Sequence, residues 1–249
     1  MGSFAANNIT TWFGGYDMTS DLNSTTLALS YDALDATAFQ PGTNTNPSRS
    51  RIAGLEDVQL DEAGFWQSGA GQVDPTAFTA LGGASQVISN SPNGLEENAA
   101  YFYRAREYSY EMFGQLGEPC PFRLTASSAR GTGLASVGGI RGIVLKTKAD
   151  VSATGATGTA SELGAVSASQ YLYAGLHVFS AGTTISGVIE SAAASNFAGA
   201  TTRITFAGVT AAGGYWGTRV AGAITDTWYR LRITACTGTF SIACVAGIR

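Results

Sequence analysis

The sequence predicts a mainly β protein, an antiparallel sandwich or barrel with one short helix. Apolar and polar residues alternate in many segments, as at Leu27, Leu29 and Tyr31, and this period of two is typical of half-buried strands. The chain also holds 32 glycines, many of them between these segments. In the C-terminal part, strands are expected about every ten residues, a spacing typical of sandwiches and barrels.

The composition favours a protein that assembles. At 249 residues, the chain can form one large β domain, or two tandem or duplicated ones. Only 13% of its residues are charged, against roughly 25% in an ordinary soluble domain. The net charge is −4, from 14 basic and 18 acidic residues. So few charges protect a monomer poorly against association. We therefore expect an obligate assembly, and the alternative is a small-residue-rich β protein that is soluble alone.

The N-terminal third is expected to hold a pair of strands that ends near Trp66. Between the two strands lies a polar loop over residues 40–51, with prolines, asparagines, serines, threonines and arginines but almost nothing to bury. A polar arm held between two strands is typical of a contact surface.

One short helix is expected over residues 75–81. Asp74 suits the N-cap and Pro75 the first helical position, while Gly82 and Gly83 supply the stop. Strands are expected to follow over residues 99–113, 120–127 and 140–147. The glycine-rich residues 130–139 lack a nucleotide-binding spacing, which indicates a flexible turn.

Residues 149–164 are small, polar and without periodicity, which predicts a linker or crossover. We therefore expect an N-terminal β domain over residues 1–148 and a β-sandwich-like half over residues 165–249. The strands expected in this second half are residues 170–180, 183–190, 201–209, 216–221, 227–235 and 239–248. Both halves share a strand-turn-strand plan, so a diverged duplication stays open.

Four segments of the N-terminal third carry a family resemblance. They are GGYD at residues 14–17, SDLN at 20–23, DALDATAF at 32–39 and RIAGLEDV at 51–58. In this order, with the polar arm between the last two, the chain resembles the major tail (tail tube) proteins of long non-contractile-tailed bacteriophages. The resemblance implies a tail-tube type of β fold. It also implies a structural subunit of the virion tail, assembled in the bacterial host cytoplasm.

The resemblance further implies the partners of the chain. Copies would form hexameric rings, or trimeric pseudo-hexamers if the halves are duplicated, and the rings would stack into a tube for DNA passage. Other tail proteins would bind at the tube ends. The arm would reach the next ring, with candidate inter-ring contacts at Gln40, Asn44, Asn46, Arg49 and Arg51.

DNA is expected only in transit, because the acidic balance leaves no basic stripe for phosphate binding. No membrane partner is expected, since no run of 18 apolar residues occurs. A secretory signal is not expected at residues 1–12 either, because no apolar core follows a basic start.

No catalytic site, metal site or cofactor is expected. The single histidine, His177, shares a strand face with Tyr171, Tyr173 and Phe179, and no nucleophile elbow accompanies it, so a packed strand histidine is expected. The three cysteines, at positions 120, 236 and 244, have no metal-ligand spacing. They are expected to be free, small and buried thiols.

A carboxylate pair is the remaining catalytic candidate. Glu107 and Glu111 lie four residues apart on one expected strand, hence roughly 13 Å apart, too far for glycoside hydrolysis. A solvated or lumen-facing wall is expected there instead.

The alternative function is that of a carbohydrate-binding β-sandwich protein of a phage tail or surface assembly. Sugar-binding sandwiches stack aromatic rings on pyranose faces, and the candidates here are Trp216 in GGYWG and Trp228 in DTWYR. Trp228 lies in an alternating strand that favours the core. Trp216 is flanked by glycines and is therefore the candidate for glycan stacking.

Overall fold

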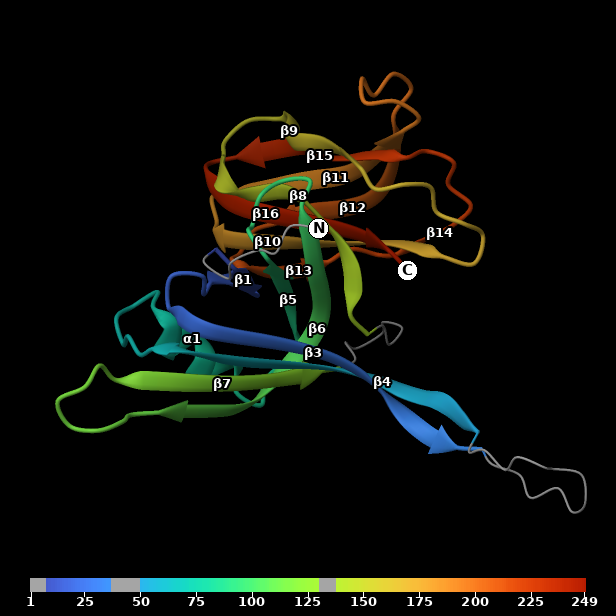
Figure 1. The fold of residues 1–249 in the computed structure, drawn as a ribbon. Coiled ribbons are helices and arrows are strands. Elements are labelled where there is room, and N and C mark those ends of the chain that lie inside the picture. Colours follow the sequence, from blue (N-terminus) through green and yellow to red (C-terminus); the bar gives the residue numbers. More distant parts are fainter. Residues whose placement is uncertain (1–7, 37–49, 130–137) are drawn as a thin grey trace, which may run out of the picture.

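A computed structural model describes residues 8–36, 50–129 and 138–249 (Figure 1). Over these residues the chain forms 16 strands and one α-helix. The strands make two sheets in which every pairing is antiparallel. The predicted mainly β, antiparallel architecture with one short helix is therefore confirmed.

The larger sheet contains 12 strands. Their bounds are β1 (Thr10–Phe13), β2 (Tyr16–Asp17), β3 (Leu22–Asp35), β4 (Arg51–Phe65), β5 (Gln86–Ser91), β6 (Ala99–Met112), β7 (Pro121–Ser128), β8 (Ile140–Val151), β10 (Tyr171–Ser180), β13 (Gly213–Trp216), β14 (Val220–Ala221) and β16 (Phe240–Ile248). The smaller sheet has the order β12-β11-β15-β9. Its strands are β9 (Gly155–Glu162), β11 (Thr184–Ala192), β12 (Thr201–Val209) and β15 (Trp228–Thr237).

Strand β6 joins two regions of the larger sheet. Along one edge it pairs first with β8, where Phe102 stands opposite Ile140, and then with β7, where Ala105 stands opposite Ser128. One side of this junction runs β6-β8-β16-β10-β13, and the other passes from β7 to β4 and β3. Because β8 belongs with C-terminal strands, the larger sheet crosses the predicted boundary at residue 148. The division into two domains stays a prediction.

The C-terminal core is a sandwich between the smaller sheet and strands β8, β10 and β16 (Figure 1). Alternate residues of each strand meet between the layers, as in two packed sheets generally. The core includes Leu145, Leu172, Ile189, Leu231 and Ile242. The strand expected over residues 216–221 is in fact two short strands, β13 and β14, which both pair with β10.

The N-terminal core lies between the other region of the larger sheet and the helix α1 (Val73–Ala80). Val73, Ala77 and Ala80 are its buried residues. The expected N-cap is wrong: Gln72 occupies that position and its side chain makes no capping bond. The Asp74 carboxylate instead accepts hydrogen bonds from Trp66 Nε1 (2.9 Å) and the Tyr110 hydroxyl (3.1 Å).

The segment over residues 149–164 is not an irregular linker. Its first residues complete β8, and most of the remainder forms β9. It does cross between layers, since β8 belongs to the larger sheet and β9 to the smaller. The Glu96 carboxylate ties the two strands together, because it accepts hydrogen bonds from the backbone amides of Thr147 (3.2 Å) and Thr159 (2.7 Å).

Four strands were not expected, namely β1, β2, β5 and β9. They are short or rich in small and polar residues, and none shows a long apolar alternation. The cysteines also differ from expectation. All three are free, but only Cys244 is buried, while Cys120 and Cys236 are partly exposed.

Candidate assembly surface

The hairpin of β3 and β4 extends beyond the sheet that carries it. Strand β4 pairs with β7 only from Gln59 to Phe65. Beyond that point, residues 29–35 and 51–58 pair with each other alone and project as a two-stranded ribbon (Figure 1). From here on, the arm means this ribbon, and the segment over residues 40–51 is called the polar loop. A two-stranded hairpin is marginally stable alone in water. The arm therefore needs other contacts to hold one position.

The arm exposes large apolar side chains. Leu34 and Ile52 stand directly opposite each other and are 50% and 56% exposed. Leu55, with 79% exposure, extends the same ribbon. Several large apolar side chains exposed on one element typically mark an interaction site.

The outer edge of β3 is open. Within the described part of the chain, β3 pairs with β4 and with no other strand. It contains no proline or lysine, which often protect an edge from pairing, although Asp32, Asp35 and two register shifts interrupt its regular pattern. Its unpaired backbone amides and carbonyls are a template for another strand.

Arg249 fixes the base of the arm. Its guanidinium forms an ion pair with both carboxylate oxygens of Glu56, and it donates to the Tyr31 hydroxyl (2.9 Å) and the Gly139 carbonyl (2.8 Å). The Glu56 carboxylate also raises the pKa of Arg249. A residue at the end of β16 thus ties both arm strands to the body.

The structure places only one of the predicted inter-ring contacts. Arg51 is exposed and begins β4 opposite Asp35. Gln40, Asn44, Asn46 and Arg49 lie outside the described residues, as do residues 130–137 of the glycine-rich segment. The exposed apolar residues of the arm were not predicted. The sequence does place Leu34 and Ile52 on either side of the polar loop, and this pair could have indicated them.

Trp216 is partly buried in an aromatic cluster. Its ring centroid lies 5.5 Å from that of Phe102 and 6.3 Å from that of Tyr173. The neighbouring Arg219 guanidinium covers Tyr171 at 4.1 Å. Both ring contacts of Trp216 are tilted rather than stacked, and a role of Trp216 in glycan stacking stays a prediction.

His177 is a packed strand histidine, as expected. It is fully buried, with Nδ1 2.7 Å from the Gly14 carbonyl oxygen and Nε2 2.8 Å from the Ser89 hydroxyl. Burial lowers the pKa of His177 to about 4, so the ring is neutral at pH 7. Its Nδ1 faces a backbone carbonyl rather than a carboxylate, and the neighbouring Ser89 is itself buried, so these described residues do not form an accessible Ser–His–acid relay.

The expected solvated wall at Glu107 is wrong. Glu107 is buried, while Glu111 is exposed. The reason is that Tyr103, Ala105 and Glu107 share the β6 face that turns into the N-terminal core. A register shift between Glu107 and Ser109 then changes the alternation.

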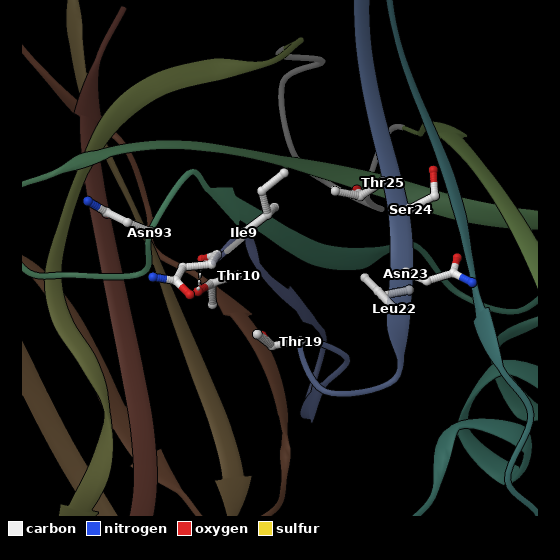
Figure 2. A pocket seen from close by; sticks show the side chains of 9 residues that line it. Ile9, Thr10, Thr19, Leu22, Asn23, Ser24, Thr25 and Asn93 are labelled. Carbon is white, nitrogen blue, oxygen red and sulfur yellow. Dashed lines mark hydrogen bonds between the residues drawn. The ribbon is translucent and has the colours of Figure 1, made fainter. Parts of the chain in front are cut away.

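A shallow pocket between β1 and the start of β3 is lined by hydroxyl, amide and aliphatic side chains (Figure 2). The residues labelled there are Ile9, Thr10, Thr19, Leu22, Asn23, Ser24, Thr25 and Asn93. None is an acid, base or thiol, so the lining supplies no general base that would activate its Ser and Thr hydroxyls.

Among the described residues, no group of three or more His, Cys, Asp or Glu side chains could hold a metal ion. Within the same residues, no helix is long and apolar enough to cross a membrane.

No known family model matches the sequence, and no curated protein matches it. Solved structures show distant similarity. One is a chain of the virion of a native gene transfer agent particle, with 13% identity. Another is a chain of the tail of an empty gene transfer agent particle with C6 symmetry. The tail chain has 15% identity and a TM-score of 0.42, over 53% of this chain and 96% of that chain.

Two further structures are similar at the same low level. A chain of the extended sheath–tube complex of PVC, an extracellular contractile injection system, has 12% identity and a TM-score of 0.41, over 57% of this chain and 93% of that chain. The SPP1 Dit protein, a hub protein of a phage adsorption apparatus, has 11% identity and a TM-score of 0.36, over 97% and 99% of the two chains. Similarity at this level carries no information on activity or partners.

Proposed function

We propose that the chain is a structural subunit of a phage-type tail that builds the tail tube from copies of itself. The observation that carries this proposal is the arm, a projecting ribbon with exposed Leu34 and Ile52, together with the outer edge of β3, which pairs with no described strand other than β4. Both features need a partner, since unpaired edges and exposed apolar ribbons otherwise promote uncontrolled association.

A second copy of the chain fits this need. If the arm of each copy docks on the body of the next copy, the contact is heterologous, and such contacts close into rings or continue as filaments. A charged fraction of 13% also suits a protein whose surface is largely interface. The proposed assembly is a stack of hexameric rings, or of trimeric pseudo-hexamers, with other tail proteins at its ends and DNA passing through the lumen.

The test is to measure assembly while changing only the apolar end of the arm. Purified wild-type protein is expected to form rings or tubes as its concentration rises, seen by mass photometry and negative-stain imaging. Leu34→Thr with Ile52→Thr keeps two β-forming residues but removes exposed apolar surface. This double variant is expected to keep the wild-type circular dichroism spectrum and to remain monomeric at concentrations where the wild type assembles.

Leu95→Thr is the matched control, because Leu95 is 58% exposed and lies in the loop before β6. It is expected to assemble like the wild type. If the arm variant assembles as well as the control, the arm is not the contact. A wild-type chain that stays monomeric at every concentration contradicts self-assembly itself.

A further inference from the structure

Two glutamate side chains lie inside the N-terminal core. Glu62 of β4 is 0% exposed and Glu107 of β6 is 1% exposed. The two strands flank β7, and Glu62 stands opposite Leu124 while Glu107 stands opposite Ala126. Leu124 and Ala126 are members of the apolar cluster beneath α1. Because opposed residues point to the same face of a sheet, both carboxyl groups enter this cluster.

The two carboxyl groups are poorly satisfied. Glu62 Oε1 is 3.4 Å from the Thr25 hydroxyl, and the Thr11 and Thr25 hydroxyls partly offset the effect of burial on the pKa of Glu62. Glu62 Oε2 and both oxygens of Glu107 are buried without any hydrogen-bond partner. An ionised carboxylate is very costly to bury in this state, and a group so placed usually takes up a proton instead.

The elements around the pair supply no compensating positive charge. From β6, Tyr103 faces the core, and its hydroxyl donates to Asn90 of β5. From α1, the titratable group is Asp74, which is engaged by Trp66 and Tyr110. Strand β7 contributes apolar residues to this face, and β1 and β2 with the following turn contribute Phe13, Met18 and Tyr16, whose hydroxyl donates to Asp21.

The basic residues nearest in sequence point elsewhere. Arg104 and Arg106 alternate with Glu107 along β6 and so lie on the opposite face. Arg123 alternates with Leu124 in the same way and pairs with Asp61. Among the ion pairs of the described residues, none involves Glu62 or Glu107.

We propose that Glu62 and Glu107 stay neutral carboxylic acids in the folded protein and form a proton-dependent lock, whose ionisation loosens α1 and the base of the arm. Burial raises the pKa of both groups to about 8, and the charge of Glu62 adds to the rise at Glu107. The Glu107 carbonyl accepts the Gly82 amide at the end of α1 (3.0 Å). Glu62 lies on the strand that continues into the arm.

The sign of the pH effect follows from proton uptake. An unfolded glutamate titrates near 4.3, while these two titrate near 8 when folded. Between these values the folded state holds protons that the unfolded state has lost, so stability falls as the pH rises. For each carboxyl group that is protonated only in the folded state, the folding equilibrium constant falls by up to about tenfold for every unit that the pH rises in this window.

The first experiment detects the protons directly. Infrared spectra of the wild-type protein at pH 6 are expected to show the carbonyl band of a protonated carboxyl group. This band should shift when glutamate is labelled with carbon-13, and it should disappear at strongly alkaline pH. A spectrum at pH 6 without a glutamate carboxylic acid band overturns the proposal, whether or not any variant folds.

The second experiment measures urea unfolding from pH 5 to pH 8 for Glu62→Gln, Glu107→Gln and the double variant. Glutamine has the same shape and does not titrate. In the wild type, the folding equilibrium constant falls as the pH rises. In each single variant this fall is expected to be smaller by a factor of up to about ten per pH unit, because one titrating group is gone. Glu111→Gln, an exposed site on the same strand, is the control and should leave the wild-type slope. An unchanged slope in the double variant contradicts the lock.

Discussion

At the scale of single residues, burial decides what His177 can do. The Gly14 carbonyl only accepts, so Nδ1 carries the proton and Nε2 accepts from the Ser89 hydroxyl. The pKa of His177 is about 4 when folded and about 6.5 when unfolded. The unfolded state therefore binds the proton first as the pH falls.

We expect this contribution to stability to be complete above pH 6.5 and to fall by about 3 kcal/mol as the pH drops from 6.5 to 4. Because the chain holds one histidine, its imidazole signals in a nuclear magnetic resonance titration need no assignment by mutation. They should stay unchanged down to pH 5. A midpoint near 6.5 would contradict the buried neutral ring. His177→Gln should remove this contribution and leave the opposite contribution of Glu62 and Glu107 in place.

At the scale of elements, the arm depends on a residue far away in the chain. Arg249 bonds Glu56 and Tyr31, one from each arm strand. Arg249→Met keeps much of the aliphatic stem and removes the charge. We expect a loss of about 1 kcal/mol in the free energy of unfolding, since the pair is partly solvated. The larger effect should be faster amide hydrogen exchange in residues 51–58.

Arg141→Met is the control for this prediction, because Arg141 is an exposed residue of β8 and forms no ion pair among those found in the described residues. Equal exchange in residues 51–58 of both variants and the wild type would show that the ribbon holds its position without Arg249.

At the scale of the whole molecule, charge pairing limits contact with DNA. Among the described residues, seven basic side chains form ion pairs with carboxylates, and the net charge of the whole chain is −4. Non-specific binding needs several free phosphate contacts and reaches about 10⁻⁴–10⁻⁶ M even in proteins that have them. We expect no gel shift of duplex DNA at physiological salt.

Two arginines in or beside the arm are the candidates for DNA binding against this expectation. Arg51 is exposed there, and Arg49 precedes it in the sequence. A gel shift that survives moderate salt and disappears in the Arg49→Ala, Arg51→Ala double variant would contradict both the proposed protein partner of the arm and the absence of DNA affinity.

The long elements were predictable because their signals are local. Residues 201–209 match β12, and residues 99–113 match β6 to within one residue. The strand expected over residues 120–127 matches β7, whose alternate residues Phe122, Leu124 and Ala126 are buried. Short strands such as β2 and β5 were missed, because they hold their place by pairing with neighbours rather than by their own pattern.

The sequence by itself determined the mainly β class, the long strands and the packed setting of His177, since alternation and turn residues act over a few positions. Tertiary structure decided the rest. It placed Glu107 in a core, because the face that a strand buries depends on what packs against it. It also joined Arg249 to Glu56 across 193 positions. Such contacts arise only when distant segments meet, and no local pattern encodes them.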